Sequence, residues 1–137
     1  MCGEFEEEDY IDDQLFSRLL QMASKYGVTP SAADASTPSD LSTEEARSNY
    51  MSGLFQAGLT RAVGDANNLG MGERMDGVAG QAIAFARLAG FLAGQLPPGA
   101  DVLRPVIDAL MEGHREPAEW GQSHNHDHHH HHHAHEH

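Results

Sequence analysis

Apolar side chains recur at three- and four-residue spacing through most of this chain, which is the period of one face of an α-helix. Four such stretches cover about residues 8–26, 42–64, 73–95 and 102–114. We therefore predict an all-α fold class, with a small helical bundle or helical hairpins of about four helices. Beyond Pro117 only Trp120 is a large apolar residue, so a disordered His-rich C-terminal tail is predicted to follow.

Local signals at the ends of these stretches support the helices. Gly27 falls where a left-handed C-cap would close the first helix. Ser42, with Glu45 three residues later, matches a capping box at the start of the second. The prolines at 97–98 end the third, and Asp101 is the predicted N-cap of the fourth.

The third stretch is apolar nearly all round, and a helix of this kind is usually central to a core. Its small residues Ala86, Gly90 and Gly94 follow one another at four-residue steps, which permits a close helix crossing. Because this helix is too apolar to remain exposed, we expect a homodimer packed near these three residues.

The length of 137 residues allows one domain. Within it we predict an acidic N-terminus and first helix over residues 1–27 and a flexible linker over 28–40, where two prolines and several serines and threonines show no apolar period. A helical core is predicted over 41–114. The disordered metal-binding tail is predicted over 115–137.

Charge excludes several partners. The chain has 8 Lys and Arg against 21 Asp and Glu, for a formal net charge of −13, so no nucleic acid is expected as a partner. We expect no membrane partner either, since no stretch of about 18 residues is apolar and uncharged. The start of the chain lacks the basic and apolar regions of a secretory signal, and Cys2 is the only cysteine. The expected location is therefore the cytoplasm.

Histidine is concentrated at one end of the chain: of eleven histidines, only His114 precedes residue 124. A neutral imidazole has an unperturbed pKa of about 6.5, and its lone pair suits nickel, zinc, cobalt and copper. The tail offers many overlapping chelates and no unique geometry, which favours capture and release of a metal over catalysis. The predicted metal ligands are His124, His126, His128, His129, His130, His131, His132, His133, His135 and His137.

The tract HNHDHHHHHHAHEH, over residues 124–137, resembles the histidine-rich tails of nickel chaperones. These include the urease nickel-delivery protein, the carbon-monoxide-dehydrogenase nickel accessory protein and His-rich hydrogenase maturation GTPases. The resemblance implies nickel as the metal and a client metalloenzyme or maturation protein as the partner. It stops at the tail, because the chain has no P-loop motif and its helical pattern contradicts the β-rich core expected of the urease chaperone.

A second group of candidate ligands lies near the end of the fourth helix: Asp108, Glu112, His114 and Glu116. They either accept metal from the tail or form a solvated face in which His114 complements the helix dipole. The chain contains no HExxH or GxSxG motif and no Glu-x-x-His pair, so we predict no enzyme.

Two hypotheses about function remain. In the first, the chain is a metal-binding accessory protein or metallochaperone whose tail captures and hands on divalent metal while the helical core recognises a partner. In the second, it is a small helical adaptor or accessory subunit of a larger complex whose His tail is incidental or a purification tag. HNHD before the six-histidine run and AHEH after it favour a native tail.

Overall fold

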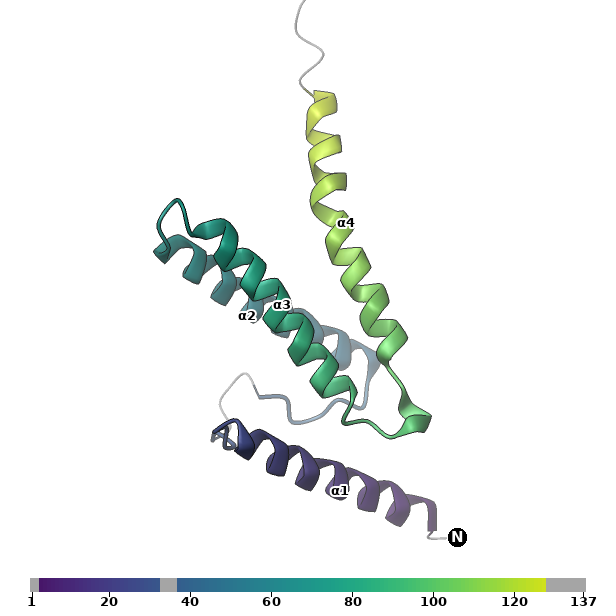
Figure 1. Cartoon of the computed structure of the whole chain (residues 1–137). Helices are drawn as coiled ribbons and strands as arrows, with labels where there is room; N and C mark the ends of the chain where they lie inside the picture. Colours follow the sequence, from purple (N-terminus) through teal and green to yellow (C-terminus); the bar gives the residue numbers. More distant parts are fainter. Residues whose placement is uncertain (1–2, 33–36, 128–137) are drawn as a thin grey trace, which may run out of the picture. The chain divides into compact units, whose positions relative to one another are not determined.

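The computed structural model describes residues 3–32 and 37–127, and these residues form helices and connections without any strand (Figure 1). The all-α fold class with four α-helices is thus confirmed. The elements are α1 (Gly3–Lys25), α2 (Glu44–Asn68), α3 (Arg74–Ala93), the short 3₁₀ helix η1 (Pro98–Ala100) and α4 (Leu103–Asp127).

The chain divides into two compact units, Met1–Leu88 and Ala89–His137. The first unit contains α1, α2 and most of α3, and the second contains the end of α3 with η1 and α4. Of the helices described, none is both long and apolar enough to cross a lipid bilayer.

The end of α1 is closed by a Schellman motif. Gly27 has φ +75°, and its N–H donates to the carbonyl of Ser24 at 3.0 Å. The N–H of Val28 donates to the carbonyl of Ala23, also at 3.0 Å. These two bonds satisfy carbonyls that the helix leaves without partners, and glycine adopts the required positive φ without steric cost. The predicted C-cap at Gly27 is confirmed.

The start of α2 lies one residue later than the predicted capping box. Thr43 is the N-cap, and its Oγ1 accepts the N–H of Ala46 at 3.1 Å. Ser42 instead donates its backbone N–H to Oδ1 of Asp40 at 2.8 Å. The side chain and backbone of Ser42 hold the pKa of Asp40 below its usual range. The prediction of Ser42 as the cap is wrong: Ser42 fits the motif through Glu45, but its backbone N–H is bound to Asp40 and the helix begins at Glu44.

Substitutions of Thr43 and Ser42 test which of the two residues caps α2. Thr43→Ala is expected to lower the free energy of opening of the first turn of α2 by about 1 kcal/mol, because the Ala46 N–H loses its acceptor. Ser42→Ala is the matched control, because it keeps the bond between Thr43 and Ala46. It is expected to change the free energy of opening by only a few tenths of the effect of Thr43→Ala. Amide hydrogen exchange at Ala46 measures both. Equal effects from the two substitutions would contradict the assignment of the cap.

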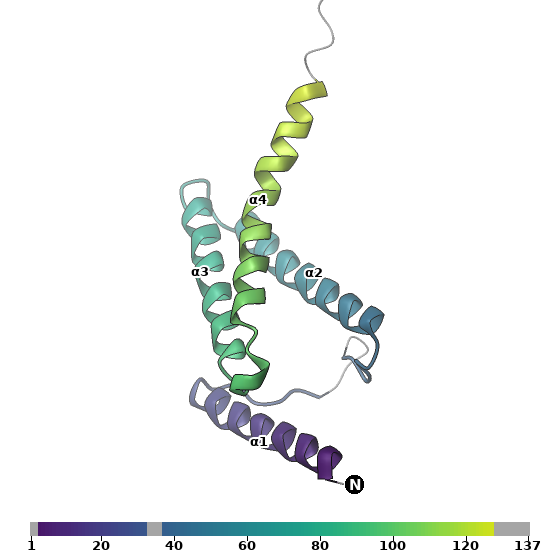
Figure 2. The same cartoon turned by 90° about the vertical axis from the view of Figure 1, so that its right-hand side faces the viewer.

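Helices α2 and α3 form an antiparallel hairpin that is closed near its connection. Nε2 of Gln81 donates to the carbonyl of Ala62 at 3.0 Å, and Nε of Arg74 donates to the carbonyl of Ala66 at 3.1 Å. A Cβ at Gly77 would clash with the side chain of Leu69, so only glycine fits there without a shift of that leucine. Away from the connection the two helices diverge (Figure 2).

The second helix is longer than its pattern indicated. It was expected to end near Gly64 but continues to Asn68, and the N–H of Leu69 donates to the carbonyl of Asp65 at 3.2 Å. An ion pair between Arg61 Nε and Asp65 Oδ2 at 2.9 Å joins residues four positions apart on this last part of the helix. Turn-forming residue types after residue 64 are therefore accommodated within the helix.

The fourth helix departs most from prediction. Its start lies one residue later than predicted: the carbonyl of Val102 accepts the N–H of Val106 at 3.0 Å, so Val102 is at the N-cap position, while Oδ1 of Asp101 accepts the N–H of Leu103 at 2.9 Å. Its predicted end at His114 is wrong, because α4 continues through Pro117 to Asp127. The described part of the predicted tail, residues 115–127, is thus helical, while residues 128–137 lie outside the described residues.

None of the described apolar side chains is buried. This holds even for α3, whose Ile83 and Leu88 are exposed. The prediction of α3 as the centre of a core is therefore wrong within a single chain. The only buried polar residue in the described part is Gln95, just after α3, whose Nε2 donates to the carbonyl of Phe91 at 3.1 Å.

Candidate functional site

The predicted metal ligands lie at and beyond the end of α4. The backbone of His124 and His126 belongs to the last turns of that helix. The other predicted ligands lie outside the described residues, and they are His128, His129, His130, His131, His132, His133, His135 and His137. The helix thus leads directly into the histidine run, which the sequence pattern had separated from it by a longer tail.

The second group of candidate ligands lies along α4 itself. Asp108, Glu112, His114 and Glu116 are all exposed to solvent. Asp108 and Glu112 share a helical face at four-residue spacing. Over the described residues, no three His, Cys, Asp or Glu side chains come together in a way that could hold a metal ion. These four side chains are therefore not brought together as an acceptor site.

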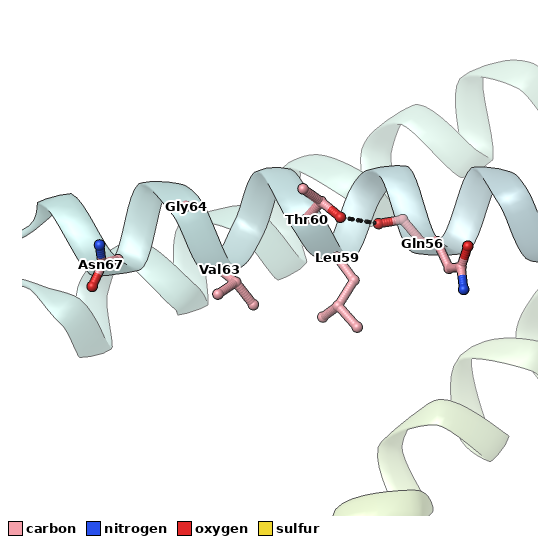
Figure 3. Close-up of a pocket in the computed structure, with 6 residues that line it drawn as sticks. All are labelled: Gln56, Leu59, Thr60, Val63, Gly64 and Asn67. Atoms are coloured by element: carbon pink, nitrogen blue, oxygen red, sulfur yellow. Dashed lines mark hydrogen bonds between the residues drawn. The ribbon is translucent and has the colours of Figure 1, made fainter. Parts of the chain in front are cut away.

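An open hollow lies along one side of α2 (Figure 3). Its lining residues recur at three- and four-residue spacing and all come from this helix: Gln56, Leu59, Thr60, Val63, Gly64 and Asn67. Oγ1 of Thr60 donates to the carbonyl of Gln56 at 2.7 Å, within the helix. None of the six lining side chains is titratable near neutral pH, so the hollow can contact a partner surface but offers no acid or base.

Sequence analysis missed this side of α2 because its polar residues interrupt the apolar pattern. Leu59 and Val63 are its only large apolar residues, and both are more than half exposed. The available signal was the four-residue step from Thr60 to Gly64, which places small residues beside them.

One aromatic contact joins the end of the α1 segment to α3. The guanidinium carbon of Arg87 lies 5.9 Å from the centre of the Tyr26 ring, within the range of a cation–π interaction. Tyr26 remains largely exposed, so this interaction contributes about 0.5–1 kcal/mol.

Comparisons with protein-family models, with curated proteins and with solved structures find no match to this chain. The likeness to nickel chaperones therefore stays a resemblance of residues 124–137.

Proposed function

We propose that this chain is a metal-binding accessory protein that captures divalent metal through its histidine-rich C-terminus and hands it on. The observation that carries the proposal is the placement of ten of the eleven histidines in residues 124–137. Several imidazoles close together bind borderline metal ions at neutral pH, when their lone pairs are free. Overlapping donor sets allow a metal to move between ligands and out to an acceptor.

Nickel is the proposed metal, ahead of zinc, cobalt and copper. Imidazole accepts all four, so the order rests on the resemblance to nickel-chaperone tails. The proposed partner is a client metalloenzyme or maturation protein in the cytoplasm, which the helices recognise. We propose no catalytic activity.

A second candidate function is favoured by a separate observation. Large apolar residues on each of the four helices are exposed, which is typical of a chain that completes its packing against other subunits. In this alternative the chain is a helical adaptor or accessory subunit, and the His tail is incidental or a purification tag. A stop codon before the triplet for His128 in the natural gene would establish a tag and exclude the first proposal.

Metal stoichiometry tests the proposed function. Calorimetric titration of the full chain with nickel or zinc is expected to give more than one bound ion, because ten imidazoles exceed the three or four that one site commonly uses. A chain ending at Gln122 is expected to lose nearly all of this binding. Its helical circular dichroism should persist, apart from the few residues removed from α4.

Two full-length variants refine the titration. In one, the histidines at 128–133 become asparagine; in the other, only His124, His126, His135 and His137 do. The first should lose more ions than the second, because six adjacent donors are removed. Unchanged stoichiometry in the chain ending at Gln122 would place the metal elsewhere and contradict the proposal.

A further inference from the structure

The hairpin of α2 and α3 is nearly neutral within a strongly acidic chain. Over residues 44–93, four arginines oppose five carboxylates, so this part carries −1 of the formal net charge of −13. Two stretches contain no charged residue at all, 48–60 in α2 and 77–86 in α3. Two copies of the hairpin can therefore approach each other without the repulsion that the rest of the chain would impose.

The faces by which α2 and α3 contact each other continue past the point where the helices diverge. Phe55 and Met51 precede Ala62 by seven and eleven residues, about two and three helical turns, so they share its face. On α3, Phe85 and Leu88 follow Gln81 by four and seven residues and share its face in the same way.

These continuing faces are apolar and uncovered. Phe55 is 66% exposed and Met51 63% exposed, although their face is the one that packs closely at Ala62. The helices close on each other only near their connection, and Figure 2 shows them separating toward the other ends. Phe55 and Met51 lie two and three helical turns farther from the connection than Ala62, and both are exposed.

We infer that these open faces dock a second copy of this chain, hairpin against hairpin about a two-fold axis, to form a four-helix core. A two-fold contact uses the same surface on both copies, which a neutral apolar face satisfies without a complementary charge. A basic or acidic partner would find no charged group to pair with over 48–60 or 77–86.

The uncovered apolar area matches what such a dimer needs. Seven large side chains on or beside these faces average about half exposed: Met51, Leu54, Phe55, Leu59, Val78, Phe85 and Leu88. At roughly 150 Å² for a whole side chain, the low end of the range for an aromatic residue, they leave roughly 570 Å² uncovered on each copy. A standard interface buries about 800 Å² per partner, of which about 56–65% is apolar, so roughly 450–520 Å².

This surface differs from the one expected from the sequence. Ala86, Gly90 and Gly94 are exposed on the side of α3 turned away from the Gln81 face, at about 140–220° around the helix. Ile83 lies on that outer side too and is 72% exposed. The two surfaces can therefore be distinguished by single substitutions.

Sedimentation equilibrium on the full, metal-free chain in EDTA tests the inference. The expected mass is twice 14.9 kDa at tens of micromolar. Phe55→Glu is expected to weaken the dimer roughly 1,000-fold, which is roughly 30-fold for each of its two symmetry-related copies. Ile83→Glu is the matched control, with an equal charge placed on the outer face, and should leave the dimer intact.

A direct contact measurement covers the case in which Phe55→Glu fails to fold. A photo-crosslinking amino acid at position 55 should join two chains into one product of doubled mass, and the same group at position 83 should not. A monomeric native chain at about 100 μM would overturn the inference. Loss of the dimer in Ile83→Glu but not in Phe55→Glu would move the interface to the small-residue side.

Discussion

Lowering the pH from 7.5 to 5.5 is expected to weaken nickel binding by about tenfold for each imidazole in a site, and by roughly 1,000-fold for a site of three. An ordinary imidazole has a pKa of about 6.5, so its neutral fraction falls from about 0.9 to about 0.09 over this interval. The proton occupies the same lone pair that binds the metal. Affinity is therefore highest above the imidazole pKa and is lost as the pH falls through it.

Nickel affinity at the two pH values, measured by competition with a chelator of known pH dependence, checks this expectation. The chain ending at Gln122 is the control and should bind little nickel at either pH. Carboxylate ligands would respond differently, because most carboxylates remain ionised at pH 5.5. Equal nickel affinity at pH 7.5 and 5.5 would exclude imidazole ligation.

Replacing Pro117 with alanine is expected to stabilise the middle of α4 by up to about 3 kcal/mol against local opening. Pro117 lies inside this helix, where it removes the N–H that would donate to the carbonyl of Gly113 and places its ring against that carbonyl. The substitution restores the bond. Amide hydrogen exchange between Arg115 and Gln122 should become slower by up to about 100-fold.

Pro105 provides a matched control in the same helix. It is the third residue of α4, where backbone N–H groups have no intrahelical acceptor, so Pro105→Ala restores no bond. Its effect on exchange after residue 114 should be negligible. Equal slowing in Pro105→Ala and Pro117→Ala, or no slowing in either, would show that Pro117 does not limit the stability of α4.

The sequence pattern located all four helices because each has a periodic apolar face and at least one clear end signal. Gly27 is the clearest of these end signals, because glycine is the residue type that most readily adopts the positive φ found just after the end of a helix. The end of α4 was misjudged because Gly113 and Pro117 are both helix-breaking types. Their cost is local, and the intervening Arg115 and Glu116 are compatible with a helix.

The absence of a buried apolar side chain in the described chain could not be predicted from periodicity. A helical pattern shows that Ile83 or Leu88 needs cover but contains no information on which chain supplies it. The metal ligands illustrate a different limit: composition identified them, but overlapping donors specify no single geometry. The hollow on α2 was missed because Gln56 and Thr60 mask its period.

The continuity of α4 also sets a defined separation along the chain. The 24 steps from Leu103 to Asp127 span about 36 Å along the helix. Each residue inserted into the helix would advance Asp127 by about 1.5 Å and rotate it by about 100°. Seven inserted residues would restore nearly the same orientation about 10 Å further on. For a partner bound to the first turn of α4, the point at which the histidine run begins is thus set by helix length in both distance and direction.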